Sequence, residues 1–271
     1  MYQITKKKQC RLCDSKDLNK IFNLCVSPLA NNLVARNIDS LKVKKYPLNL
    51  MFCNKCNHVQ LEHVVSSKKL YNNYLYMTGI SQQFKYHFKN YVEKVLKLFS
   101  KVSPLQVLEI GSNDCTLLDY FKERKCITVG VEPAQNLWNL TKNNHDIFNS
   151  FYNRSTNNKL LKKYKSFDVI TANNVFAHID DIQNVFLLLK NLMHTKSLII
   201  FEVSYLSDVI DKKLFDTIYH EHLCYHTINP LDLFLQNHGL ELIHVERIDS
   251  KGGSIQCQAQ KKGGPRKRST Y

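Results

Sequence analysis

The stretch "DTIYHEHLCYHT", residues 216–227, concentrates groups that can move protons. It holds three histidines, one glutamate and two tyrosines. An imidazole titrates near neutral pH, so a histidine here is suited to act as a general base. A carboxylate could orient that imidazole, and a phenol or a second imidazole could donate a hydrogen bond to a developing oxyanion. Taken by itself, the stretch is equally compatible with a polar loop whose histidines have hydrogen-bonding partners.

A catalytic metal is a weaker interpretation of the same residues. His220 and His222 are two positions apart, so on a helix they would point in different directions, unlike the pair in H-E-x-x-H. On a strand they would share a face, and His226 could add a third ligand. The stretch therefore favours acid and base chemistry over metal catalysis.

Two C-x-x-C pairs mark a separate metal site near the N-terminus. Cys10 and Cys13 form the first pair, and Cys53 and Cys56 form the second. Two such pairs complete the tetrahedral thiolate shell that structural zinc prefers. The alternative, reduced cysteines packed as small apolar side chains, fits poorly because polar residues surround both pairs. Four sulfurs leave no open position, so we expect this zinc to support the fold.

A glycine turn follows the first strand of the central region. "VLEIGSNDCTLL" runs from an apolar strand through Gly111 into a helix, with Glu109 near the strand end. Glycine lets the backbone pass close to a ligand. The next strand ends at Glu132, where a carboxylate can accept both hydroxyls of a ribose. Because G-x-G-x-x-G is absent, the arrangement favours S-adenosylmethionine over a dinucleotide.

Alternating helices and strands must position these groups. Residues 81–100 place apolar side chains at helical spacing. Four apolar strands then alternate with helices between residues 105 and 204, and a helix and a strand follow within 226–250. This alternation predicts a parallel sheet covered on both faces, the α/β class. Residues from 252 onward are not expected to form a complete element.

The composition is typical of a globular protein, with 44% hydrophobic and 23% charged residues among 271. We find no apolar run of about 18 residues and no signal peptide, so a cytoplasmic protein without membrane contact is expected. The formal net charge of +15 raises nucleic acid as a partner. The lysines are spread along the chain without a recognition module, however. Nucleic acid is therefore disfavoured, and a basic surface suits an anionic small substrate equally well.

Segments over most of the chain stand in the order of one known family. They are "CRLC", "SPLANN", "YPLNLMFCNKC", "VLEIGSNDCTLL", "GVEPAQN", "NNVFAHIDD", "FEVSYLSD", "FDTIYHEHLCY" and "GGSI". The chain thus resembles the S-adenosylmethionine-dependent C-methyltransferases that act on nucleotide-linked keto-deoxysugars. The resemblance implies a zinc-binding domain over residues 1–68 and a Rossmann-like class I methyltransferase domain over residues 69–250. Residues 251–271 would be a basic tail, the remnant of a C-terminal domain that a partner chain could supply.

The resemblance also implies roles for individual residues. The residues expected to form the S-adenosylmethionine site are Glu109, Gly111, Ser112, Asn113, Glu132, Pro133 and Asn173. The residues expected to face the reacting sugar are Tyr76, Tyr219, His220, Glu221 and His222.

Methylation of a carbon next to a ketone requires a base that removes a proton from that carbon. We expect His222 to be this base and Glu221 to orient an imidazole or bind a sugar hydroxyl or amine. His220 or Tyr76 would donate a hydrogen bond to the enolate oxygen. Tyr76 is the alternative base, provided that its pKa is depressed.

Two positions depart from the family pattern. Cys115 stands where glycine is usual, and Lys251 replaces the histidine before Gly-Gly-Ser. Two other functions stay open at this point. The chain could methylate another small acceptor with the same cofactor, or it could be an inactive zinc-bearing binding module. Only methylation at carbon requires the base that residues 219–222 offer.

Overall fold

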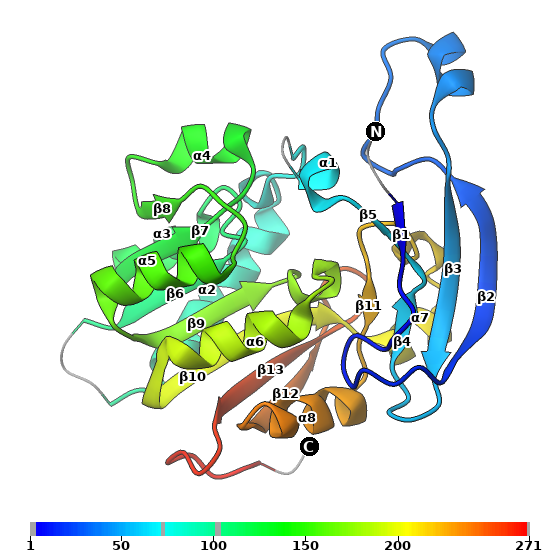
Figure 1. Ribbon diagram of the computed structural model, residues 1–271. Helices are drawn as coiled ribbons and strands as arrows, with labels where there is room; N and C mark the ends of the chain where they lie inside the picture. The colour runs from blue at the N-terminus through cyan, green and yellow to red at the C-terminus, as the bar shows by residue number, and fades with distance from the viewer. Residues whose placement is uncertain (1–3, 72–73, 101–103, 270–271) are drawn as a thin grey trace.

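The computed structural model describes residues 4–71, 74–100 and 104–269. The two ends of the chain, residues 1–3 of the expected zinc-binding domain and 270–271 of the expected tail, lie outside this part. A seven-stranded sheet forms the larger region of the molecule, and a four-stranded and a two-stranded sheet form the smaller one (Figure 1). Residues of both regions, among them Val64 and Glu109, line one cavity.

The seven-stranded sheet has the order β12-β13-β10-β9-β6-β7-β8. Its strands are β6 (Gln106–Ile110), β7 (Ile127–Val131), β8 (Asp146–Phe148), β9 (Phe167–Asn173), β10 (Met193–Ser204), β12 (Leu240–Ile248) and β13 (Ser254–Lys261). Neighbouring strands from β8 to β10 are parallel, whereas β13 is antiparallel to both β10 and β12. The carboxyl ends of the parallel strands therefore meet at one edge, where ligands of such sheets bind.

Helices cover both faces of this sheet, which confirms the predicted α/β class. The helices of the larger region are α2 (Gln82–Leu96), α3 (Thr116–Glu123), α4 (Gln135–Thr141), α5 (Arg154–Tyr164), α6 (Ile182–Asn191) and α8 (Ile228–Asn237). On β6, Leu108 belongs to the apolar cluster that holds residues of α5, α6 and α8, while its neighbour Val107 belongs to the cluster with residues of α2 and α3. This alternation follows from the two-residue period of a strand. The predicted helix over 81–100 is confirmed as α2, and Ser81 caps it by accepting the N–H of Phe84 at 3.3 Å.

The smaller region is built mainly from the first 71 residues. Its strands are β1 (Ile4–Lys6), β2 (Leu18–Ser27), β3 (Tyr46–Cys53), β4 (Val59–Leu61) and β5 (His63–Val65). Its short helices are η1 (Asn37–Lys42) and α1 (Ser67–Tyr71), and η2 (Thr78–Ile80) lies between α1 and α2. The remaining short elements are η3 (Phe176–His178), α7 (Leu206–Asp211), η4 (Phe215–Thr217) and β11 (Cys224–Tyr225).

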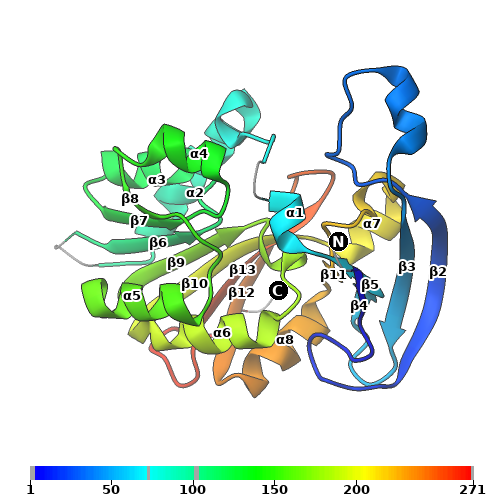
Figure 2. The same ribbon diagram turned by 45° about the horizontal axis from the view of Figure 1, so that its top comes forward.

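The two-residue strand β11 joins the two regions. It extends the four-stranded sheet, where Cys224 pairs with Gln60 and Tyr225 with Val59. The preceding residue, Leu223, accepts the N–H of Leu61 at 3.0 Å and donates its own N–H to the carbonyl of Ala177 at 2.7 Å. The "YHEH" stretch is thus held between the small sheet and the loop that follows β9, and both views place β11 between the two regions (Figure 2).

Arg11 connects the same two regions from the other side. Its buried guanidinium donates to the carbonyl of Leu61 at 2.7 Å and to the carboxylate of Asp180, in the loop before α6, at 3.0 Å. Its backbone N–H also donates to the side chain of Gln60 at 2.8 Å. Hydrogen bonds to a buried charge are strong, so this residue fixes the small region against the large sheet.

The segment after residue 250, which the sequence analysis assigns to a tail, contributes the inner strand β13. Its glutamines obscure the apolar pattern of a strand that is buried on both faces. Gln256 donates to Glu202 at 2.9 Å and Gln260 donates to Glu241 at 2.7 Å, so these buried amides have partners. Gly252 and Gly253 form the preceding turn.

Within the described part of the chain, no helix combines the length and the apolar character that crossing a membrane requires.

Candidate active site and metal centre

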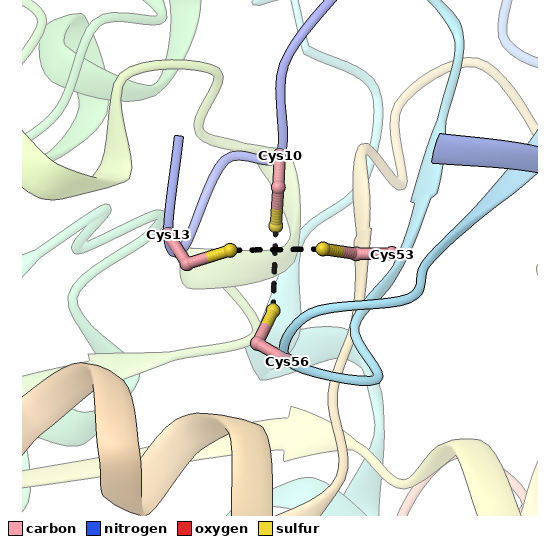
Figure 3. A group of neighbouring side chains, drawn as sticks. All are labelled: Cys10, Cys13, Cys53 and Cys56. Atoms are coloured by element: carbon pink, nitrogen blue, oxygen red, sulfur yellow. Dashed lines mark hydrogen bonds between the residues drawn. The ribbon is translucent and has the colours of Figure 1, made fainter. Parts of the chain in front are cut away.

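The four cysteines of the two C-x-x-C pairs lie together. Their sulfur atoms all fall within 4.8 Å of one another, with Cys10 3.5 Å from Cys56 and Cys13 3.6 Å from Cys53. Figure 3 shows the four side chains converging on one point. In a tetrahedral shell with Zn–S bonds of about 2.3 Å, the sulfurs stand about 3.8 Å apart. The geometry therefore fits a zinc ion with four thiolate ligands.

Two tight turns present these sulfurs. Asp14 N–H donates to the carbonyl of Cys10 at 3.0 Å, and Asn57 N–H donates to that of Cys53 at 2.8 Å. Asp14 and Asn57 both adopt positive φ, which aspartate and asparagine tolerate better than most residues. The hydrogen bond with Cys56 lowers the pKa of Cys10 to about 5, so one sulfur of this pair is readily ionised.

A cavity of about 510 Å³ opens at the carboxyl end of the parallel strands. Ten of the twelve residues predicted for the cofactor and sugar sites line it. They are Tyr76, Glu109, Gly111, Ser112, Asn113, Glu132, Pro133, Asn173, Tyr219 and Glu221. His220 and His222 are the two that do not. Both expected halves of the site thus share one space.

The glycine turn between β6 and α3 forms one wall of this cavity. Gly111 has a φ of 68°, and a Cβ there would lie 2.7 Å from Val175 Cγ2, so no other residue fits without displacing Val175. Asn113 and Cys115 also have positive φ, at 51° and 63°. Cys115 therefore occupies the left-handed conformation at a cost of about 1–2 kcal/mol that the usual glycine avoids.

Glu132 sits across this turn at the end of β7. Its two carboxylate oxygens accept the backbone N–H groups of Asn113 and Ala134, each at 2.8 Å. Burial raises the pKa of Glu132, and these two hydrogen bonds oppose that shift. Each oxygen keeps a free lone pair for a further donor, such as a ligand hydroxyl.

Several buried polar atoms in the cavity wall have no protein partner among the described residues. They are Oε2 of Glu109, Oγ of Ser112, Oδ1 of Asn173 and Oε2 of Glu221. Burial, followed by the neighbouring acids Asp114 and Glu132, raises the pKa of Glu109 well above its usual range. A buried polar atom without a partner costs about 1–3 kcal/mol, so this wall is suited to a polar ligand.

The segment that carries Tyr76 is fastened to the glycine turn. Asn113 donates from its side chain to the carbonyl of Tyr76 at 3.0 Å and accepts the N–H of Thr78 at 3.0 Å, while Asp114 accepts the N–H of Gly79 at 2.6 Å. Burial raises the pKa of Tyr76. This shift is opposite to the one that a tyrosinate base would need, so Tyr76 is better suited to donate a hydrogen bond.

His222 does not line the cavity itself but contacts two residues that do, Tyr219 and His178. Its Nδ1–H donates to the carbonyl of Thr217 at 2.8 Å, which leaves Nε2 to accept the hydroxyl of Tyr219 at 3.1 Å. Burial lowers the pKa of His222 to about 4, so the imidazole is neutral and can take up a proton. The two rings lie 4.3 Å apart between centroids.

His220 points into the small region. Its Nε2–H donates to the carbonyl of Tyr46 at 3.2 Å, and its ring lies edge-on to the Tyr46 ring at 5.8 Å. The expectation that His220 faces the sugar therefore does not fit this position.

Glu221 lies at the cavity with two neighbours that the sequence analysis did not include. Its Oε1 accepts the side-chain amide of Asn31 at 2.6 Å, and its carbonyl accepts Nδ1–H of His178 at 2.9 Å. His178 also contacts Tyr71 at 2.9 Å and lines the cavity. Asn31 belongs to the quoted segment "SPLANN" and His178 to "NNVFAHIDD". The family motifs could therefore have indicated that both residues lie at the site.

A parallel sheet with helices on both faces, a glycine turn after its first strand and an acid at the end of the second define the Rossmann-like methyltransferase class. The chain belongs to the family described as "Methyltransferase domain", whose model matches residues 84–245. Residues 10–71 match the family described as "Putative zinc binding domain". The predicted fold class is confirmed.

Among curated proteins, the chain is similar to a C-methyltransferase. C-methyltransferase NovU from Streptomyces niveus is 27% identical over 248 residues, which cover 91% of this chain and 59% of NovU. The chain therefore spans about three fifths of the length of that relative. The resemblance to C-methyltransferases indicated by the sequence motifs is confirmed.

Solved structures show the same fold. The PH0226 protein from Pyrococcus horikoshii OT3 is similar with a TM-score of 0.54 and 12% identity, over 69% of this chain and 95% of that protein. Magnesium protoporphyrin IX methyltransferase (ChlM) from Synechocystis PCC 6803, with bound S-adenosylhomocysteine (SAH), gives a TM-score of 0.50 and 11% identity, over 66% and 83%.

The cysteine geometry predicts a single structural zinc ion. Replacing Cys56 with serine should abolish zinc retention and lower the Tm by on the order of 10 °C, because the shell loses a thiolate. Zinc is measured by plasma mass spectrometry and unfolding by circular dichroism. Cys25→Ser is the matched control, since Cys25 is exposed and outside the cluster. Full zinc content in Cys56→Ser would contradict the assignment.

Proposed function

We propose that the protein transfers a methyl group from S-adenosylmethionine to a carbon next to the ketone of a nucleotide-linked keto-deoxysugar. One observation carries the proposal: the glycine turn with Glu132 opens into the same cavity as Tyr219 and Glu221. A cofactor site and a proton-handling group that share one space can act on the same substrate carbon. The zinc ion is structural in this proposal.

The cavity wall fits S-adenosylmethionine. Glu132 has a free lone pair on each oxygen for the two hydroxyls of a ribose. The unpartnered atoms of Glu109, Ser112 and Asn173 would bind the polar parts of the adenosine and methionine groups. The structural neighbour ChlM carries S-adenosylhomocysteine, the product of this cofactor. When bound, S-adenosylmethionine supplies a methyl group on a positively charged sulfur.

Tyr219 and His222 form the proposed path for the substrate proton. Burial raises the pKa of Tyr219 as well, so its phenol is no tyrosinate base and acts only as a relay. As the phenol oxygen takes the proton from the substrate carbon, the proton of the phenol moves in concert to Nε2 of His222, which is the final acceptor. The electron pair of the C–H bond becomes part of a C=C bond, and the carbonyl pair moves onto oxygen to give an enolate. The carbonyl of Thr217, which accepts Nδ1–H, stabilises the imidazolium that forms.

The sugar part of the proposal has separate support. NovU, which is similar over most of this chain, is a C-methyltransferase, and methylation at carbon requires an acidified C–H such as one beside a ketone. The free Oε2 of Glu221 can bind a hydroxyl or amine of a sugar ring. The net charge of +15 suits a substrate that carries a diphosphate, and we favour thymidine diphosphate as the nucleotide.

Proton exchange tests this function directly. His222→Ala should lower exchange of solvent deuterium into the carbon beside the ketone by about 10²- to 10⁴-fold, because the proton loses its acceptor. The measurement is NMR of thymidine diphosphate-linked keto-6-deoxyhexoses. Because burial lowers the pKa of His222 to about 4, the wild-type rate should hold as pH falls from about 8 to about 6 and decline only nearer pH 4.

The matched control for this experiment is His220→Gln, which changes the neighbouring histidine that contacts Tyr46 instead of the cavity. It should exchange at the wild-type rate. Absence of exchange in the wild-type protein, together with methyl transfer to an oxygen or nitrogen acceptor, would replace carbon methylation with another acceptor chemistry.

The cofactor half of the site has its own test. Gly111→Ala should weaken binding of S-adenosylhomocysteine at least 10-fold by calorimetry, because its Cβ would collide with Val175 and displace the wall. Gly263→Ala is the matched control, since Gly263 also has positive φ, at 76°, but no atom lies within 4 Å of a Cβ there. Equal affinities in both variants would place the cofactor away from this turn.

A further inference from the structure

The turn between β12 and β13 brings a lysine to the cavity. Lys251 lines the cavity, and its Nζ lies 4.9 Å from the centroid of the Tyr76 ring and 5.6 Å from that of Phe84. Its backbone has a φ of 50°, a conformation that lysine rarely adopts. The hairpin therefore holds this side chain in place against a local backbone cost.

Contacts with α7 and the residues around it fix the hairpin. Lys212 donates to the carbonyl of Gly252 at 2.8 Å, and Tyr205 N–H donates to that of Gly253 at 3.2 Å. Asp208 packs so closely that a Cβ at Gly253 would lie 2.2 Å from its carboxylate. Only glycine fits there, so the position of Lys251 is set by the surrounding structure.

The ammonium of Lys251 has no ion pair or hydrogen bond within the described residues; its contacts are the two aromatic rings. Two carboxylates act on it at longer range. Glu202 is already bound by His87 at 2.8 Å, and Glu221 by Asn31. Burial lowers the pKa of Lys251, while these carboxylates favour its charged form. A cation that lines a cavity without an anionic partner is available to an anionic ligand group.

The charge of Lys251 lies at the proton-handling end of the cavity. Burial is the main cause of the low pKa values of His178 and His222, and the positive charge of Lys251 lowers both pKa values further. It also opposes the rise that burial causes in the pKa of Glu221. Lys251 also lines the same cavity as Tyr219 and Glu221 and lies over the ring of Tyr76, so its ammonium stands among the residues proposed for the acceptor.

We propose that Lys251 is a catalytic residue that stabilises the enolate oxygen of the acceptor, an inference that rests on the proposed C-methylation. As the proton leaves carbon toward Tyr219, the carbonyl electron pair moves to oxygen, and the Lys251 ammonium donates a hydrogen bond to that oxygen. The proton stays on nitrogen. When the enolate carbon bonds to the methyl group, the C–S pair goes to sulfur, the carbonyl re-forms and the hydrogen bond weakens. The interaction is thus strongest when charge is greatest.

A diphosphate is the other anion that this ammonium could bind. The position of its Nζ over the Tyr76 ring, in the cavity that Tyr219 also lines, favours the reacting oxygen, because a nucleotide diphosphate would extend away from the carbon that loses its proton. The two roles differ in what they change. An oxyanion partner alters the rate at saturating substrate, whereas a diphosphate partner alters substrate affinity.

The experiment compares the Lys251→Met and Lys251→Arg variants with the wild type. The readouts are deuterium exchange and methyl transfer into thymidine diphosphate-linked keto-6-deoxyhexoses, with the ketone at carbon 3 or carbon 4. Lys251→Met should lower both maximal rates by about 10²- to 10³-fold, as loss of an oxyanion donor does, and leave the affinities for S-adenosylhomocysteine and thymidine diphosphate unchanged. Lys251→Arg should recover part of both rates because it keeps the charge.

Lys262→Met is the matched control, because Lys262 is exposed in the turn after β13, and it should behave as wild type. Wild-type exchange in Lys251→Met, or loss of thymidine diphosphate affinity with unchanged maximal rates, would overturn the role of Lys251 while leaving the proposed function intact. Absence of exchange in the wild-type protein would overturn the proposed function and this inference with it. If Lys251→Met does not fold, Lys251→Gln with the same readouts decides the question.

Discussion

The pairing of β11 with β4 is the constraint on which the site depends. A segment more than 150 residues away in sequence joins the small sheet through Cys224 and Tyr225. This pairing holds Tyr219 and His222 beside the carboxyl ends of the parallel strands, and Arg11 fixes the same two regions through Asp180. Arg11 lies between Cys10 and Cys13, so a zinc ion bound by the four cysteines would order the loop that carries it. Because Asp180 also lines the cavity, a metal ion held by the four cysteines would contribute to the position of the proton-handling group.

The cavity wall contains polar groups that destabilise the free protein but suit a polar ligand. Glu109, Ser112, Asn173 and Glu221 each bury a polar atom without a partner in the described part of the chain. Each such atom costs about 1–3 kcal/mol in the free protein, a cost that a polar ligand would offset on binding. Cys115, in the turn that carries Ser112, adds a residue with positive φ just behind this wall. Costs of this kind concentrate at functional sites because only ligand contacts compensate them.

The sequence predicted those parts of the fold that local patterns determine. Periodic apolar residues specified α2 and the parallel strands, and the C-x-x-C spacing predicted the cysteine cluster. It did not predict β13, because buried glutamines such as Gln256 are satisfied by partners distant in sequence. The spacing of the residues also could not show that His222 lies next to Tyr219 whereas His220 contacts Tyr46, because the orientation of each side chain depends on the pairing of β11. Lys251 was noted only as a departure from a family pattern.

The central claim is that the cofactor turn and the Tyr219–His222 pair serve one reaction space. A crystal structure of the complex with S-adenosylhomocysteine tests it most directly. The account predicts ribose hydroxyls on Glu132 and the sulfur atom directed across the cavity toward the hydroxyl of Tyr219, with room for a sugar ring between them. A ligand bound outside this cavity, or a sulfur atom separated from Tyr219 by protein, would contradict the account.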